Sequence, residues 1–282
     1  MKTEIKTWED FEKASLRIIS EMRERKEKTK RHIYYPLFRG QSNSNWPLES
    51  SLGRIQKEMS FDHYQRIIMI VRKHIETCTG KKWELSEKIF LERGLELNEY
   101  EFMAYLRHNE FPSPLLDWSR SPYIAAYFAF SDIYLMSKGV KFVSIFVFPE
   151  HRLYGDNPYI RSLGPTIDTH LNHYLQQSEY TICVKRQKDK IYFDENKAVC
   201  DKKQKNEICF GDYEAVKNGG NQGPMIKYNI PATEQSKVLR KLDSMNITAY
   251  SLFGSESSLM ETLAIREICF QKWDRLLASK NE

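Results

Sequence analysis

Three prolines in residues 112–122 constrain this chain more than any other feature. They remove backbone donors and push the preceding residues into extended conformations, so this segment cannot form one continuous helix. The chain then enters residues 123–130, an alanine-rich apolar run, for which Ser121 offers an N-cap and Pro122 the first helical position. The small alanines predict that this helix packs closely on a sheet.

Periodicity in the rest of the chain predicts both helices and strands. Apolar residues at helical spacing predict helices over residues 8–28, 62–77, 97–107, 235–245 and 258–277. Runs rich in β-branched and aromatic residues predict strands over residues 33–39, 142–148, 180–185, 208–210 and 225–230. With no repeat and no low-complexity linker, we expect one α+β domain over residues 1–282. Its parts would be an N-terminal helix in 1–30, a core in 31–255 with a basic insertion at 185–207, and a C-terminal helix in 256–282.

Composition narrows the class of protein. The chain has 282 residues, of which 41% are hydrophobic, and this is enough for a substantial core. It has no run of about 18 apolar residues and no apolar N-terminal signal, so we expect a cytoplasmic protein with no membrane partner. The five cysteines are scattered and form no C-x2-C pair. This pattern argues against a disulfide framework and against a metal site.

The sequence also lacks the motifs of several common enzyme classes. It contains no G-x-G-x-x-G, no P-loop, no H-E-x-x-H and no G-x-S-x-G. The usual signatures of Rossmann dehydrogenases, NTPases, zinc proteases and α/β-hydrolases are therefore missing. NAD as a consumed substrate stays open, because its use needs no Rossmann loop.

Three short polar segments stand beside predicted strands or turns. Arg39 closes a predicted strand and meets Gly40, which suits it to hold an anion, although an ion pair with a nearby carboxylate is also open. Ser119 and Ser121 can act in a site or simply cap the following helix. Glu179 precedes a predicted strand, where a carboxylate is either an exposed edge charge or a catalytic group.

Four ordered blocks resemble the FRG domain family, which takes its name from a Phe-Arg-Gly motif. That motif stands here at residues 38–40, followed by Gln41, Trp46 and Arg54. The remaining blocks that resemble the family lie at residues 106–129, at 175–181 and at 230–253. The chain departs from the family pattern at Arg107, at 109–110 and at 254–255.

The order of the polar residues also looks like the Arg, Ser-x-Ser and Glu arrangement of ADP-ribosyltransferases. The FRG domain family itself looks like a remote relative of these enzymes. This resemblance implies a mixed or antiparallel β core of the ADP-ribosyltransferase type, and NAD as the consumed substrate. Glu179 would stabilise the ribosyl cation that forms when the nicotinamide bond breaks. Gln177, which we expect on an extended segment and on the same face as the glutamate, would contact the acceptor. Arg39 would position the phosphate side of NAD.

The resemblance implies further NAD contacts around these residues. Aromatic rings would stack on nicotinamide and hydroxyl groups would orient the ribose or the glutamate. His108 is either a buried structural histidine or a contact to NAD or the acceptor. The residues expected to bind NAD are Arg39, Gln41, His108, Ser119, Ser121, Tyr127 and Phe128.

A basic stretch follows the Glu179 strand. Between residues 185 and 205 basic side chains outnumber acidic ones and are interleaved with aromatic ones. The stretch is either a solvated hairpin or an arm that follows phosphates of RNA or DNA. Its candidate nucleic-acid-binding residues are Lys185, Arg186, Lys188, Lys202 and Lys203.

The leading hypothesis is an NAD-dependent ADP-ribosyltransferase that modifies an RNA or DNA base. A bacterial toxin or an anti-phage defence effector is the expected setting, with an antitoxin protein as a further partner. The alternatives are transfer to a protein, hydrolysis of NAD by water, and a non-catalytic module that binds a nucleotide or phosphate.

Overall fold

The computed structural model of the chain describes residues 2–29, 35–56, 59–83, 89–92, 95–97, 99–148, 160–163, 171–187, 190–193 and 225–278. Its α-helices are α1 (Trp8–Thr29), α2 (Ser51–Ile55), α3 (Phe61–Thr79), α4 (Tyr100–His108), α5 (Pro122–Phe130), α6 (Leu171–Leu175), α8 (Gln235–Ser244), α9 (Ala249–Phe253), α10 (Glu256–Ala264) and α11 (Phe270–Ala278). The 3-10 helix η1 (Ala232–Glu234) precedes α8, and the π-helical turn η2 (Ile265–Cys269) joins α10 to α11. The strands are β1 (Lys2–Glu4), β2 (Leu37–Gln41), β3 (Ile89–Glu92), β4 (Leu95–Leu97), β5 (Leu116–Ser119), β6 (Phe142–Phe148), β7 (Ile160–Ser162), β8 (Ser178–Gln187), β9 (Lys190–Phe193) and β10 (Ile226–Pro231).

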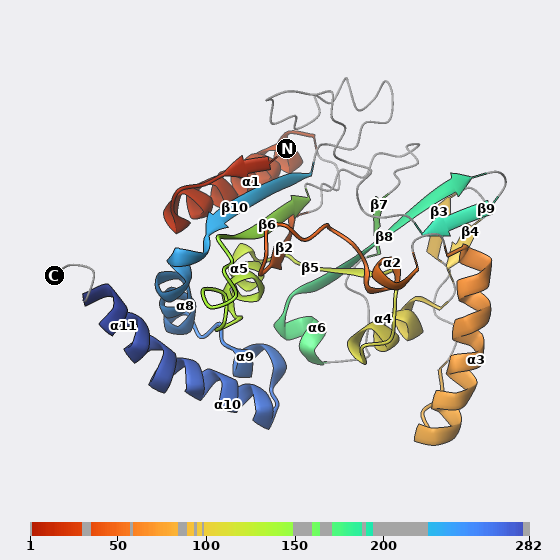
Figure 1. The fold of residues 1–282 in the computed structure, drawn as a ribbon. Helices are drawn as coiled ribbons and strands as arrows, with labels where there is room; N and C mark the ends of the chain where they lie inside the picture. The colour runs from red at the N-terminus through yellow and green to blue at the C-terminus, as the bar shows by residue number, and fades with distance from the viewer. Residues whose placement is uncertain are drawn as a thin grey trace.

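A mixed sheet organises the molecule (Figure 1). Its strands follow the order β1-β10-β6-β2-β5-β8-β7, and β9 pairs with β8 beside this path. The β1–β10 pair is parallel and the other pairs are antiparallel. Strands β3 and β4 form a separate hairpin. Figure 1 shows α1, α5, α8 and the α10–α11 helix toward one end of the sheet, and α2, α3 and α4 toward the other.

Helix α5 lies on the sheet at β2 because neither partner has bulky side chains at the contact. A Cβ atom on Gly40 would lie 1.9 Å from the carbonyl oxygen of Ala125 and 2.7 Å from the backbone nitrogen of Ala129. The helix starts as expected, since Ser121 Oγ accepts a hydrogen bond from the backbone of Ile124 at 3.3 Å. Phe38 is fully buried in the core under this helix.

Two more apolar clusters complete the core. The face of the sheet away from α5 carries a cluster formed by side chains of β2, β5, β6 and β8, together with Leu48 and Met225. Side chains of α3 and α4 pack with Tyr180 and Ile182 of β8 in the third cluster. Strands β5 and β8 therefore have packed groups on both faces, and polar side chains on them are held in place by their surroundings.

The sheet and its helices confirm the expected α+β class. The helices predicted at residues 8–28, 62–77, 97–107, 123–130, 235–245 and 258–277 are present, the last with the π-helical turn inside it. The strands predicted at 142–148, 180–185 and 225–230 are also present. The strand predicted at 208–210, residues 33–34 of another, and most of the basic insertion lie outside the described residues.

No helix in the described part of the chain is long and apolar enough to cross a membrane.

Candidate functional site

Two arginines share one carboxylate at the centre of the sheet. Arg39 on β2 donates from Nη1 to the backbone oxygen of Asp117 on β5 at 2.6 Å, and the same nitrogen lies 3.5 Å from the carboxylate. Arg107 on α4 donates to Oδ2 of Asp117 from Nη2 at 2.6 Å and from Nε at 3.1 Å. The ion pair that the sequence left open for Arg39 is therefore present.

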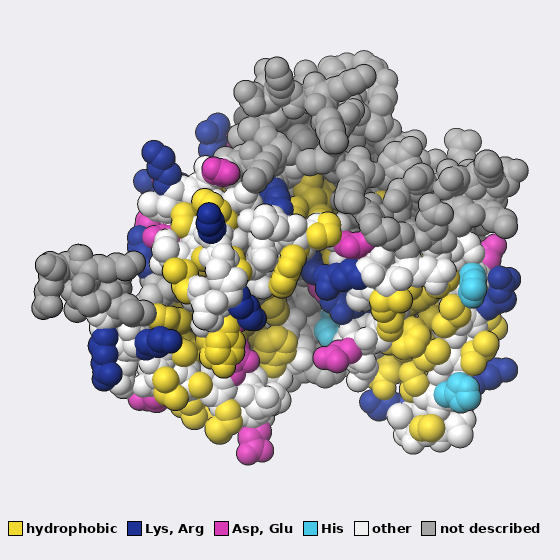
Figure 2. Space-filling model, in the orientation of Figure 1, with side chains coloured by type: hydrophobic (Ala, Val, Ile, Leu, Met, Phe, Trp, Pro, Cys, Tyr) yellow, Lys and Arg dark blue, Asp and Glu magenta, His cyan; other side chains and the backbone are white. Residues whose placement is uncertain are grey.

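This centre carries more positive than negative charge. Burial lowers the pKa of Arg39, and the neighbouring charges of Arg107 and Arg54 add to that effect against the attraction of Asp117. Burial opposes ionisation of Asp117, but Arg107 and Arg39 outweigh it and hold the pKa of this carboxyl below its ordinary value. Figure 2 shows Lys and Arg side chains grouped over β5, beside α2, with acidic and His side chains close by.

One donor in this centre has no partner among the residues that the structure describes. Nε of Arg39 is buried, and it makes no hydrogen bond to any described residue. A buried donor without an acceptor costs free energy, so a ligand oxygen or a water that reaches it is stabilised. The excess positive charge makes an anion the favoured ligand of this centre.

A second ion pair lies on the neighbouring strand pair. Glu179 on β8 is buried, and Oε1 accepts a hydrogen bond from Nε of Arg120 at 2.6 Å. Nη2 of Arg120 contacts the same oxygen, while Oε2 accepts a hydrogen bond from Ser162 at 3.0 Å. Glu179 is not the exposed edge charge that the sequence left open, because β8 lies between β5 and β7 and is no edge strand here.

Arg39 of the first centre and Glu179 of the second share one face of the sheet. Arg39 is the register partner of Phe146, and Glu179 is the register partner of Trp118. Phe146 and Trp118 belong to the apolar cluster on the face away from α5, and directly opposed residues point to the same side. The backbones of Arg39 and Glu179 are two strand spacings apart, about 10 Å. Trp118, which is buried, stands between them.

The two serines have structural partners. Ser119 is paired with Phe38, so it faces α5 rather than the side of Arg39 and Glu179. Its hydroxyl donates to the backbone oxygen of Gln176 at 2.8 Å and accepts from the backbone of Ser121 at 3.0 Å. These bonds fix the end of β5 beside the turn before β8. Ser121 caps α5, as the capping alternative predicted.

The two glutamines occupy different surroundings. Gln177 was expected on an extended segment, and this is wrong: its φ is 47°, and it forms the turn before β8. It is exposed, and its backbone oxygen accepts a hydrogen bond from the backbone of Arg120 at 3.1 Å. Gln41 is buried and donates to the backbone oxygen of Pro47 at 3.2 Å, while its Oε1 has no partner in the described part of the chain. Gln41 therefore anchors the loop after β2.

His108 belongs to a polar cluster between α4, α6 and β8. Its Nε2 lies 2.7 Å from Nε2 of His173 and 2.8 Å from the hydroxyl of Tyr180. A contact between two ring nitrogens requires one to donate and the other to accept, so the two imidazoles hold unlike roles. Burial raises the pKa of Tyr180, which keeps its hydroxyl protonated as a donor. Tyr180 is the register partner of Asp117, so this polar cluster lies beside Asp117 of the first centre.

The two aromatic candidates on α5 lie elsewhere. Tyr127 is buried in the core and donates from its hydroxyl to Glu261 at 2.9 Å. Phe128 is half-buried, and its ring meets that of Phe253 edge-on at 6.0 Å. The structure does not bring these rings into contact with either charged centre.

The basic candidates are only partly described. The backbone of Lys185 and Arg186 forms the outer half of β8, paired with β9. Lys188, Lys202 and Lys203 lie outside the described residues. Among the residues that the structure describes, no group of three or more His, Cys, Asp or Glu side chains could hold a metal ion.

Sequence reasoning missed the ion-pair partners that define both centres. Asp117 and Arg107 lie far from Arg39 in sequence, and Arg120 lies 59 residues before Glu179. A signal for Arg120 existed: it stands between the two serines, and strand alternation places it on the same side as Trp118. Ser162 had no signal, since nothing in its sequence context marks a strand beside β8.

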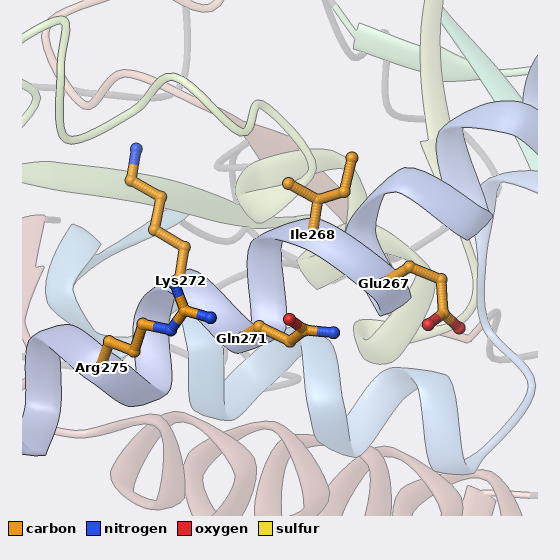
Figure 3. Close-up of a pocket in the computed structure, with 5 residues that line it drawn as sticks. All are labelled: Glu267, Ile268, Gln271, Lys272 and Arg275. Carbon is orange, nitrogen blue, oxygen red and sulfur yellow. The ribbon is translucent and has the colours of Figure 1, made fainter.

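A shallow depression on the C-terminal helix lies apart from these centres (Figure 3). It has a volume of about 380 Å³ and is lined by five side chains of η2 and α11. Because one helix supplies all five, the depression is an open helix surface rather than a cleft. The lining residues are Glu267, Ile268, Gln271, Lys272 and Arg275.

Comparison with known protein families finds a match over part of the chain. Residues 35–135 match the FRG domain. The matched range includes Arg39, Arg107, Asp117 and Arg120, whereas Glu179 lies beyond it. No curated protein and no solved structure matches the chain.

Proposed function

We propose that this chain, whose residues 35–135 match the FRG domain, is an NAD-dependent ADP-ribosyltransferase that modifies a nucleic-acid base. One observation carries the proposal: β2, β5 and β8 are consecutive neighbours in the sheet, and they hold Arg39 and Glu179 on one face. An anion-binding arginine about 10 Å from a buried carboxylate suits a substrate with a diphosphate at one end and a developing cation at the other.

The chemistry assigns one task to each centre. Arg39 binds the diphosphate of NAD and is supported by Arg107 through Asp117. Glu179 faces the ribose attached to nicotinamide, where its charge stabilises the cation that forms at C1′. The bond between C1′ and the nicotinamide nitrogen breaks, and its electron pair leaves with neutral nicotinamide. A lone pair of the acceptor forms the new bond to C1′, and the acceptor's proton passes to water.

The surroundings of Glu179 favour a nucleic-acid acceptor. Gln177 is exposed in the turn before β8, close in sequence to Glu179, which suits a contact with an acceptor. The basic stretch at residues 185–207 favours a nucleic acid as the acceptor, since Lys and Arg side chains neutralise backbone phosphates. A toxin or anti-phage defence role, with an antitoxin as partner, rests on the family resemblance and on no contact in the structure.

A binding module is the second candidate, and a specific observation favours it. Both charged centres already have internal partners, Asp117 for Arg39 and Arg120 for Glu179. A protein that only recognises a nucleotide or phosphate would need the first centre and not the second. Turnover that depends on Glu179 separates the two functions.

The test is an incubation of pure protein with labelled NAD and RNA, DNA or a cell lysate. We expect label on nucleic acid with the wild type and with Glu267→Gln, an exposed glutamate on η2 that serves as the matched control. Glu179→Gln and Arg39→Ala should abolish the transfer. Label on protein identifies a different acceptor, and free ADP-ribose alone identifies an NAD glycohydrolase. Ligand binding without any turnover that depends on Glu179 contradicts the proposal and supports the binding module.

A further inference from the structure

The ion pair between Arg120 and Glu179 is asymmetric. The side chain of Glu179 is 4% exposed, whereas that of Arg120 is 38% exposed. Both carboxylate oxygens are occupied, one by Arg120 and the other by Ser162. Arg120 is therefore the partner that can move into solvent, and Glu179 is uncovered only when it does.

Arg120 also lies close to the anion-binding centre. Its backbone nitrogen donates to Gln177, which continues the β5–β8 pairing by one residue beyond Ser119. If the pairing of Phe38 with Ser119 is extended along the strands, Arg39 and Arg120 become diagonal neighbours on one face, about 7–8 Å apart. Two guanidinium groups that start so close can reach one diphosphate, which an arginine fork binds as readily as a carboxylate.

We propose that Arg120 exchanges partners: it leaves Glu179 to bind the diphosphate of an ADP-ribose-containing ligand, and ligand binding thereby uncovers the carboxylate. The inference rests on the proposed function for the identity of the ligand, and it adds how the site opens.

Charge balance explains why NAD suits such an exchange. A buried carboxylate that loses its counter-ion is strongly unfavourable unless another cation replaces it. The diphosphate of NAD attracts Arg120, and its positively charged nicotinamide ring faces the carboxylate that Arg120 has left. ADP-ribose supplies the diphosphate and lacks this positive charge, so it makes Arg120 leave without compensating Glu179.

This difference between NAD and ADP-ribose gives a test that needs no turnover, namely the binding of ADP-ribose measured by calorimetry. Glu179→Gln should bind ADP-ribose about tenfold more tightly than the wild type, because Arg120 no longer has to leave a charged partner. Arg120→Gln should weaken binding about tenfold, for loss of one charge-assisted contact. The double variant should bind as weakly as Arg120→Gln. Arg266→Gln, which breaks an exposed ion pair with Asp243, is the matched control and should leave binding unchanged.

The double variant also guards against misfolding. Arg120→Gln alone leaves Glu179 buried without a counter-ion, so it can unfold for that reason. Comparison of the double variant with Glu179→Gln measures what Arg120 contributes in a protein that has no such charge. Equal binding by these two variants overturns the inference, as does a Glu179→Gln variant that binds no more tightly than the wild type.

The outcome is independent of the proposed reaction. Nicotinamide release without the expected binding pattern overturns the exchange and leaves the transferase standing. The expected pattern without nicotinamide release supports the exchange and contradicts the transferase. Absence of ADP-ribose binding to the wild type overturns the exchange, while nicotinamide release still decides the reaction.

Discussion

The two faces of β2 divide the Phe-Arg-Gly motif between two tasks. Phe38 and Gly40 face α5, where the ring is fully buried and the glycine lies against helix backbone. Arg39 and Gln41 face the other side, where each has a buried polar atom that no described residue hydrogen-bonds. Adjacent residues of one strand thus build the fold on one face and the candidate site on the other.

The two faces should therefore respond differently to substitution. On the α5 face the free energy comes from apolar burial and close packing, so a change there lowers stability. On the opposite face the ion pair between Arg39 and Asp117 is partly exposed and contributes little to stability, so a change at Arg39 acts mainly on ligands. Five substitutions can break or sharpen this division, and the largest loss of stability is expected for Gly40→Ala.

Gly40→Ala is expected to have the largest effect. The new methyl group would overlap a carbonyl oxygen and a backbone nitrogen of α5, neither of which can turn aside. The loss should exceed the roughly 1–3 kcal/mol typical of overpacking, so that no cooperative unfolding transition remains. Urea unfolding followed by circular dichroism measures this. Gly139→Ala is the control: apart from its chain neighbours, no described residue lies within 4 Å of an added Cβ, and its φ of 68° costs roughly 1–2 kcal/mol.

Phe38→Ala should lower stability by about 3–5 kcal/mol, as expected when a buried ring is removed from a core. Arg39→Ala, the neighbouring change on the other face, should cost about 1 kcal/mol because the lost ion pair is partly exposed. Equilibrium unfolding of both variants in urea makes the comparison. An Arg39→Ala variant less stable than Phe38→Ala would break the division between the two faces.

Asp117→Asn should reduce stability by about 1 kcal/mol at neutral pH, a small value because a third of this side chain is exposed. The pKa of Asp117 is lowered below its ordinary value of 3.8, so its contribution is present above pH 3.8 and is lost as the pH falls through the folded-state pKa. The wild type should therefore lose more stability than the variant below pH 3.8. Thermal unfolding against pH checks this, and parallel curves for the two proteins would show that Asp117 does not hold the arginines.

Ser121→Ala should cost about 1 kcal/mol or less, the usual value for loss of a helix N-cap. Because Ser121 was also a candidate NAD ligand, the variant sharpens the comparison. A loss of stability with unchanged ADP-ribose binding assigns the serine to the fold alone. Weaker binding with unchanged melting temperature assigns it to the site instead, and calorimetry beside thermal unfolding distinguishes the two results.

Local chemistry made much of the fold predictable. The start of α5 follows from Ser121 and Pro122, and β6 follows from its β-branched and aromatic run. The turn at Gln177 was not predictable from the local sequence. The positive φ of this residue accompanies a backbone hydrogen bond from Arg120, which is distant in the sequence. The short strand β1 pairs with β10 more than 200 residues later, and no local pattern specifies such a partner.

The candidate site was predictable in its residue types and not in its pairing. Arg39 and Glu179 were identified from their places beside predicted strands, and both lie on interior strands of the sheet. Their partners Asp117 and Arg120 come from β5 and the turn after it. Sheet order decides this, and the order β2-β5-β8 depends on packing over the whole chain.

Release of nicotinamide from NAD tests the central claim most directly. With equal amounts of folded protein, we expect release by the wild type and by the control Glu267→Gln, and a rate at least about 100-fold lower for Glu179→Gln. Equal rates for the wild type and Glu179→Gln, or no release by the folded wild type with any acceptor, would contradict the proposal that this face of the sheet cleaves NAD.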